Sequence, residues 1–183
     1  MLPPRHIRHE VFDVQELPTH GGSLRVFAKK LSSNAHLIHD SVGQLLKREL
    51  EAGIKTSAYY SQTQADALRI KRDLVRFLLD AQEAGKVVAA YGAAAKGNTL
   101  LNFAGVRPDL VQLVVDRSPG KQGKFMPGSR IPIVNEEQLV ASQPDYVLIL
   151  PWNIEQEVKQ QLSNNHPNAK WQYVTAIPKL TIS

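Results

Sequence analysis

Residues 87–98 read VVAAYGAAAKGN, and no other stretch of the sequence says more about the fold. The apolar run from Val87 to Tyr91 predicts a short strand that is covered on both faces, as is typical of a parallel sheet. Small residues and two glycines follow, and the segment TLLNFAG at 99–105 then predicts a helix. Strand, small-residue loop and helix in this order form the corner at which an α/β sheet holds a ligand.

The loop between this strand and helix has the residue types that an anion needs. Gly92 and Gly97 permit close backbone approach, the unpaired amides of a helix start favour negative charge, and Lys96 adds a cation. The spacing Gly-x-x-x-Lys-Gly matches neither the dinucleotide fingerprint nor the P-loop. Phosphate or pyrophosphate fits this corner; the alternative is that the small residues only let the helix pack close to its strand.

Further periodic segments predict an α/β domain. Apolar runs predict strands over 110–115, 131–134, 146–150 and 171–177, and helices over 136–141 and 154–163. Strands that alternate with helices indicate a Rossmann-like, mostly parallel sheet with helices on both faces. We therefore expect residues 33–183 to form this domain, with a helical lead-in at 33–84 and the α/β sheet at 85–183.

The N-terminal third has a different pattern. Residues 1–32 form the first predicted segment, in which 10–16 and 23–29 are extended pieces joined like a hairpin through 17–22. In 33–84, two helices are expected, separated by Gly53 and the Tyr59-Tyr60-Ser61 stretch, with Gly85 as the final stop. Their apolar stripes are predicted to be core; they comprise Leu37, Val42, Leu45, Leu46 and Leu50 in the first helix and Ala67, Ile70, Leu74, Phe77, Leu78 and Ala81 in the second.

Several polar residues lie where strands are expected to end. Asp116 follows the 110–115 strand, where it either bonds a ribose or sugar hydroxyl or caps the turn before Ser118. Lys121, with Lys124 and Arg130, either binds phosphate or solvates its loop. Trp152 is a candidate for stacking on a base or sugar, and Asn153 either contacts ligand or caps the next helix.

Composition bounds the function classes. The 183 residues are 43% hydrophobic and 21% charged, which is ordinary globular usage, and the net charge is +5. The cations are scattered without a basic groove-reading helix, so nucleic acid is not an expected partner, and a phosphorylated small molecule suits the charge as well. No segment is apolar enough for a bilayer or a signal peptide, which predicts a cytoplasmic protein without a membrane partner. Cysteine is absent, and no metal site is expected.

Several motifs in order resemble one family. They are Tyr91-Gly-Ala-Ala-Ala-Lys-Gly-Asn-Thr-Leu-Leu-Asn102, Val115-Asp-Arg-Ser-Pro-Gly-Lys-Gln-Gly123, Met126-Pro-Gly-Ser-Arg-Ile-Pro-Ile133 and Pro144-Asp-Tyr-Val-Leu-Ile-Leu-Pro-Trp-Asn153, with Thr19-His-Gly-Gly-Ser-Leu-Arg25 near the start. Together they are similar to the C-terminal domain of S-adenosylmethionine-dependent C-methyltransferases that act on nucleotide-linked deoxysugars. The resemblance runs from about residue 10 to the end.

The resemblance also implies that different domains of the enzyme have different roles. In such enzymes a zinc module and a central domain that binds S-adenosylmethionine precede this part, and the catalytic acid and base lie upstream. We therefore expect no catalytic residue and no bound cofactor in this chain, only contacts to a nucleotide-sugar. The implied substrate-binding residues are His20, Gly21, Gly22, Ser23, Arg25, Gly92, Ala93, Lys96, Gly97, Asn98, Asn102, Asp116, Lys121, Trp152 and Asn153.

Two alternatives to this function stay open. The chain is a stand-alone subunit that binds a nucleotide or an acyl-coenzyme A through the same loop, or it is a docking module for a separate methyltransferase. An exposed apolar patch near residues 1–30 favours docking, whereas an open cleft at Lys96 favours ligand binding.

Overall fold

The computed structural model describes residues 8–19 and 22–183. By its internal contacts the chain divides into two compact units, Met1–Gln64 and Ala65–Ser183, and the boundary falls within helix α2 (Ser57–Glu83). The second unit carries the stretch at 87–98, so we describe it first.

A six-stranded sheet forms the centre of the second unit. Its order is β5 (Ile133–Val134), β4 (Val114–Val115), β3 (Val88–Tyr91), β6 (Tyr146–Ile149), β7 (Gln172–Thr175) and β8 (Thr181–Ile182). All neighbours pair in parallel except β7 and β8, so the predicted mostly parallel α/β sheet is confirmed. Strand β8, which pairs antiparallel with β7 at the edge of the sheet, was not predicted.

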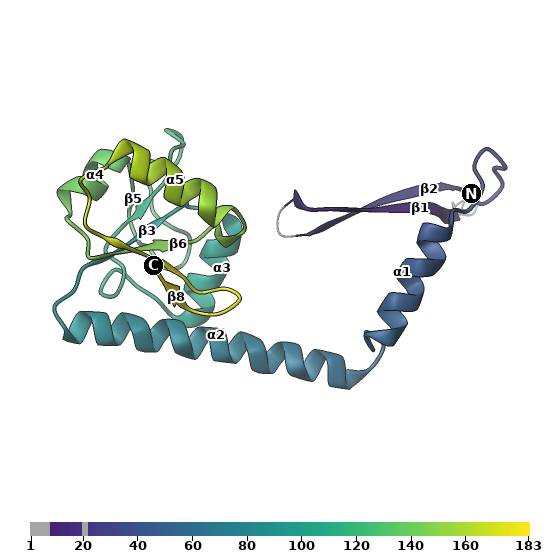
Figure 1. Ribbon diagram of the computed structural model, residues 1–183, viewed down its shortest axis with the longest axis horizontal. Helices are drawn as coiled ribbons and strands as arrows, with labels where there is room; N and C mark the ends of the chain where they lie inside the picture. The colour runs from purple at the N-terminus through teal and green to yellow at the C-terminus, as the bar shows by residue number, and fades with distance from the viewer. Residues whose placement is uncertain (1–7, 20–21) are drawn as a thin grey trace, which may run out of the picture. The chain divides into compact units, whose positions relative to one another are not determined.

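Alternate residues of the strands build two cores. Val88 and Ala90 face helix α2 and helix α3 (Ala95–Ala104), whereas Ala89 and Tyr91 face helix α4 (Glu136–Ala141) and helix α5 (Glu155–Asn165). Figure 1 shows these two helix pairs on opposite faces of the sheet. Leu74, Leu78 and Ala81 of α2 are buried, and Ile70 and Phe77 pack partly buried against the same core, which confirms most of the predicted stripe of this helix. The helix ends before Gly85, whose φ of +69° suits glycine.

An ion pair fixes the start of β3 against β6. The Asp145 carboxylate accepts hydrogen bonds from Lys86 Nζ at 2.8 Å and from the Val87 amide at 2.9 Å. The hydrogen bond from Lys86, helped by that amide, holds the pKa of Asp145 below its ordinary value. The charged carboxylate is therefore favoured in the folded state.

We expect Asp145→Asn to lower the melting temperature at pH 7, with a difference from the parent protein that shrinks as pH falls below about 4. A carboxyl whose pKa is lowered on folding contributes stability above its unfolded pKa, and this contribution disappears as the pH falls through the folded pKa. Thermal melts at pH 7 and pH 3 measure the difference. Asp109→Asn, at an exposed position, is the matched control, and a pH-independent difference for Asp145→Asn contradicts the assignment.

The described residues of the first unit form a two-stranded antiparallel sheet and one complete helix. Strand β1 (His9–Leu17) pairs with β2 (Ser23–Lys30), and helix α1 (Asp40–Glu51) follows. The prediction that the stripe of this first helix is core was wrong: α1 has no buried residue, and Leu46 and Leu50 are 59% and 65% exposed. Two strands offer too little surface to bury a helix face.

The start of α2 also differs from the prediction. Gly53 ends the preceding turn with φ of +77°, but Tyr59, Tyr60 and Ser61 lie inside α2, which begins at Ser57. The hydroxyl of Ser61 donates to the carbonyl of Ser57 at 3.0 Å, so this polar residue is accommodated within the helix. Among the described residues, no helix is both long and apolar enough to cross a membrane.

Candidate functional site

The loop between β3 and α3 lies at the carboxyl edge of the sheet, where β6 also ends. Gly92 follows β3 with φ of +92°, and a Cβ placed on it would lie 2.5 Å from Pro151 Cδ. Pro151 follows β6, so the chain turns away from the two neighbouring strands at one point. Glycine is therefore required here both for its backbone angle and for the close approach of Pro151.

Gly97 has a packing role. It is buried in the first turn of α3, and a Cβ placed on it would lie 2.5 Å from Leu150 Cβ. The absence of a side chain lets α3 lie directly against the end of β6. For Gly97, the alternative of close helix packing is thus the one that the geometry supports.

The amino end of α3 faces the edge of the sheet without a side-chain cap. Ala94 stands at the N-cap and makes no side-chain hydrogen bond. The amides of the first helical turn have no acceptor within their own helix, and the helix dipole adds partial positive charge at this end. Lys96 is exposed in the same turn, with its Nζ 5.9 Å from the centre of the Trp152 ring. A cation, an aromatic ring and amide donors thus meet at this corner.

Asp116 ties this loop to the end of β4. One carboxylate oxygen accepts from the Ala93 amide at 2.9 Å and from Lys121 Nζ at 3.0 Å, and the other accepts from the Ser118 amide at 2.9 Å. The last bond is the predicted cap of the turn. Asp116 therefore holds the loop in place, and contact with a hydroxyl of a ligand stays a prediction.

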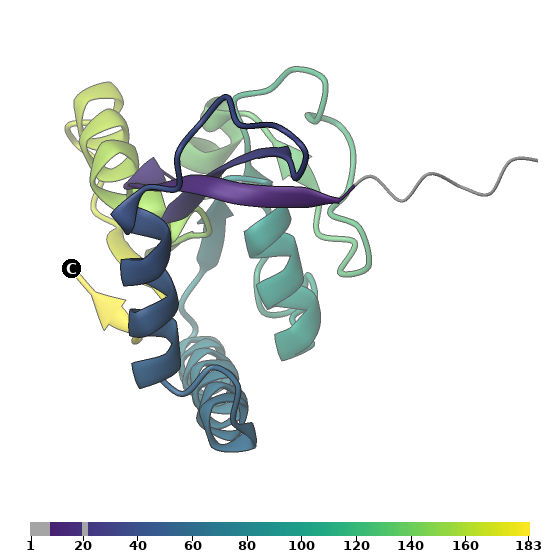
Figure 2. The same ribbon diagram turned by 90° about the vertical axis from the view of Figure 1, so that its right-hand side faces the viewer.

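A second anchor joins α3 to the long connection between β4 and β5. Asn102 Nδ2 donates to the carbonyl of Pro127 at 2.8 Å and to the carbonyl of Asn98 at 2.9 Å. A Cβ on Gly128 would lie 2.2 Å from Asn102 Oδ1, and Gly128 has φ of +80°. Figure 2 shows this connection, coloured green-teal, looping out beside α3. Asn102 thus positions the connection, and direct substrate contact by Asn102 stays untested.

Two pockets flank the β3–α3 loop. The loop pocket measures about 430 Å³ and is lined by Ala93, Ala94, Ala95, Asn98, Gly120, Lys121, Lys124, Phe125, Met126, Pro127 and Ile133. The α5 pocket measures about 310 Å³ and is lined by Tyr91, Gly92, Ala94, Asp116, Arg117, Pro151, Ile154, Glu157, Val158 and Gln161. Ala94 borders both pockets, so the amino end of α3 lies between them.

Several of the predicted residues lie outside the two pockets. Trp152 and Asn153 belong to the 3-10 turn η2 (Trp152–Ile154), and neither they nor Lys96 line either pocket. The prediction that Asn153 caps α5 was wrong: Ile154 occupies the N-cap, because η2 adds a turn before the helix begins.

The predicted residues near the N-terminus lie in the first unit. His20 and Gly21 lie outside the described residues. Gly22 has φ of +111°, as the predicted turn requires. Ser23 Oγ donates to the carbonyl of Thr19 at 2.9 Å, and Arg25 Nη1 donates to Gln15 Oε1 at 3.4 Å. These bonds are local to the strand pair, and a substrate role for this segment stays a prediction.

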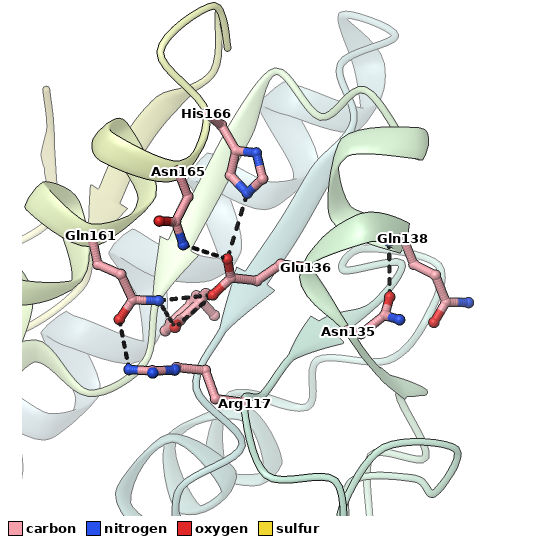
Figure 3. A network of polar contacts seen from close by, with 8 residues as sticks. Arg117, Asn135, Glu136, Gln138, Gln161, Asn165 and His166 are labelled. Atoms are coloured by element: carbon pink, nitrogen blue, oxygen red, sulfur yellow. Dashed lines mark hydrogen bonds and ion pairs between the residues drawn. The ribbon is translucent and has the colours of Figure 1, made fainter.

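A polar network that the sequence reading missed supports the α5 pocket. Gln161 bridges Arg117, Tyr91 and Glu136: its Oε1 accepts from Arg117 Nη1 at 3.1 Å, and its Nε2 donates to the Tyr91 hydroxyl at 2.9 Å and to Glu136 Oε1 at 2.8 Å (Figure 3). Burial raises the pKa of Tyr91, so its hydroxyl stays neutral. These four residues come from separate parts of the chain, so no local sequence pattern indicated the network.

Comparison with known proteins identifies the family. A family model described as "C-methyltransferase C-terminal domain" matches residues 18–178, which is most of the chain. This chain belongs to the C-methyltransferase C-terminal domain family. The match includes the β3–α3 loop, both pockets and the connection between β4 and β5. The family resemblance predicted from the sequence motifs is therefore confirmed.

A curated relative is also a C-methyltransferase. The chain is 35% identical over 148 residues to "C-methyltransferase NovU" of Streptomyces niveus. The matched segment covers 81% of this chain but only 35% of NovU, so the chain spans about a third of that relative. The C-methyltransferase C-terminal domain described here is thus similar to one part of a longer enzyme.

Proposed function

We propose that this C-methyltransferase C-terminal domain binds a nucleotide-linked sugar at the carboxyl edge of its sheet and positions it for methylation by another part of the enzyme. The observation that carries the proposal is the uncapped amino end of α3 between two pockets. Backbone amides and a helix dipole at such a position favour a phosphate or diphosphate. A ligand with a group on each side of its diphosphate then fills both pockets.

The strand order supports this placement. In chain order the sheet runs third, second, first, fourth, fifth and sixth strand, as in doubly wound, Rossmann-like sheets. Ligands of these sheets bind where the chain leaves neighbouring strands in opposite directions. That point lies here between β3 and β6, where Gly92 meets Pro151. Lys96, beside the Trp152 ring, places a cation at the same corner.

The chemical task of the domain is orientation. The family implies S-adenosylmethionine as the methyl donor of full-length members, and we assign that donor and the catalytic base to the part of the enzyme that this chain does not span. Carbon methylation needs a carbanion or enolate beside a keto group, formed close to the methyl donor. A domain that fixes the diphosphate and the sugar reduces the motion that otherwise opposes this encounter.

Calorimetric titration of the purified chain tests this function. The panel comprises thymidine-diphosphate glucose, thymidine diphosphate, coenzyme A and S-adenosylmethionine. We expect saturable heat for the thymidine-diphosphate sugar and none for S-adenosylmethionine. Binding of coenzyme A in preference to nucleotide-sugars supports the alternative of a stand-alone subunit that binds an acyl-coenzyme A. No binding across the panel contradicts autonomous ligand binding.

A docking role is the second candidate, because the first unit exposes apolar side chains. Leu24 and Val26 of β2 are 44% and 51% exposed, and Leu31 is 52% exposed. Leu46 and Leu50 of α1 are exposed as well. Several exposed large apolar side chains in one small unit are typical of a surface that binds another protein. Since the relative NovU is about three times as long as the matched segment, a methyltransferase part is the fitting partner. If the chain has this role, we expect no heat of binding from the chain alone with any ligand of the titration panel.

A further inference from the structure

The two pockets differ in chemistry in a way that orients the ligand. We propose that the sugar lies in the α5 pocket, the nucleobase lies in the loop pocket, and the diphosphate crosses the amino end of α3 between them. This inference rests on the proposed function and adds which half of the ligand each pocket recognises. It also gives roles to residues that the family resemblance did not supply, principally Phe125, Arg117 and Glu157.

The α5 pocket has the mixture of groups that a hydroxylated ring needs. Glu157 is exposed on α5 and offers carboxylate oxygens as acceptors, while Arg117 offers several N–H donors from one planar group. Pro151, Ile154 and Val158 supply an apolar wall for the C–H face of a sugar. Acceptors, donors and an apolar wall in one small pocket match a sugar ring, which has hydroxyls around its edge and C–H groups on its face.

The Arg117 guanidinium is held in place by a chain of side-chain contacts on α4 and α5. Gln161 accepts from Arg117 and is itself held by Glu136, whose second oxygen accepts from Asn165 Nδ2 at 2.9 Å (Figure 3). His166 Nε2 lies 3.5 Å from the same oxygen of Glu136. A side chain anchored through such a chain of contacts presents its remaining donors in a fixed direction, which suits discrimination among sugar hydroxyls. Gln161 and Glu136 are thus positioning residues.

The loop pocket has the surface that a planar base needs. Phe125 is 58% exposed, and Met126, Pro127 and the alanines of the β3–α3 loop complete a mainly apolar lining. Lys124 Nζ donates to the carbonyl of Gly120 at 2.6 Å, and Lys121 Nζ is bound to Asp116. These two cations are thus held by the protein, while their apolar stems line the pocket. An exposed aromatic ring binds a nucleobase by stacking, and this contact depends little on which base it is.

The β3–α3 loop fixes the distance between the two halves. The Ala93 amide is bound to Asp116, and the Gly92 amide donates to the carbonyl of Val115 at 2.7 Å. Both bonds hold the loop against β4, so the separation of the pockets is built into the sheet edge. A diphosphate that lies on α3 then joins the base on one side to the sugar on the other.

Two substitutions distinguish the contacts to the nucleobase from the contacts to the sugar. We expect Phe125→Ala to weaken thymidine diphosphate and thymidine-diphosphate glucose equally, by about tenfold, because one stacking contact is lost. We expect Glu157→Gln to weaken binding of thymidine-diphosphate glucose about fivefold and to leave binding of thymidine diphosphate unchanged, because the glutamine oxygen still accepts a hydrogen bond but without the assistance of a charge. Both residues are exposed, so the fold is retained. Calorimetry of the full chain measures all four affinities.

Each of the two substitutions has a matched control at an exposed residue outside both pockets. Phe103→Ala and Glu83→Gln change exposed residues of the same types that line neither pocket, and both should bind like the parent protein. If Glu157→Gln weakens the free diphosphate as much as the sugar conjugate, or if Phe125→Ala spares the free diphosphate, this orientation is wrong. If the parent protein binds neither ligand, the proposed function itself fails.

Discussion

Gly97→Ala should destabilise the second unit by about 1–3 kcal/mol, the range for an extra methyl group in a packed interior. The new Cβ would lie 2.5 Å from Leu150 Cβ, closer than carbon atoms approach in proteins, and Leu150 is fully buried. Either α3 moves away from the sheet or β6 shifts. Both displacements disturb the loop that precedes α3, so ligand affinity should fall together with stability.

Denaturant unfolding measures this loss, with Gly120→Ala as the control. Gly120 belongs to the same unit, and a Cβ placed on it would have its nearest neighbour, Ser118 Oγ, at an ordinary 3.8 Å. The control should change the free energy of unfolding by less than about 0.5 kcal/mol. Equal stability of Gly97→Ala and the parent protein would show that α3 does not pack against Leu150 as described.

Lys96→Ala should weaken binding of thymidine-diphosphate glucose by about tenfold to a hundredfold, since hydrogen bonds to charged groups contribute roughly 1.5–3 kcal/mol. Lys96 is exposed in the first turn of α3, so its removal should leave the free energy of unfolding nearly unchanged. The loss should shrink as salt concentration rises, because exposed charges are screened.

Lys170→Ala is the matched control for Lys96. Lys170 is also exposed, and it precedes β7 at the opposite edge of the sheet. Removing it lowers the net charge by the same amount without touching the candidate site. Equal weakening by the two substitutions would mean that overall charge, and not the corner at α3, attracts the ligand.

The sequence predicted the second unit well because its signals are local. The strand at 87–91 and a helix after the small residues were both predicted, but α3 begins at Ala95, four residues before the predicted segment at 99–105, so Lys96 and Gly97 lie in its first turn and not in the loop. The alternation of Val88 and Ala90 with Ala89 and Tyr91 between two cores is what a strand covered on both faces requires.

The missed features depend on contacts between distant residues. The link from Arg117 through Gln161 to Glu136 joins three elements and has no local pattern. The role of Gly97 needs Leu150, which lies 53 positions later in the sequence. The prediction that the stripe of α1 is core was wrong because periodicity shows an apolar face but does not identify what covers it.

An amide chemical-shift titration of the isotope-labelled chain with thymidine-diphosphate glucose tests directly whether the ligand binds at the amino end of α3. We expect the largest shifts on residues 92–98, with further shifts at Phe125 and Glu157 on the two sides of α3. Shifts that instead gather around residues 165–171, which line a pocket at the opposite edge of the sheet, would contradict this placement.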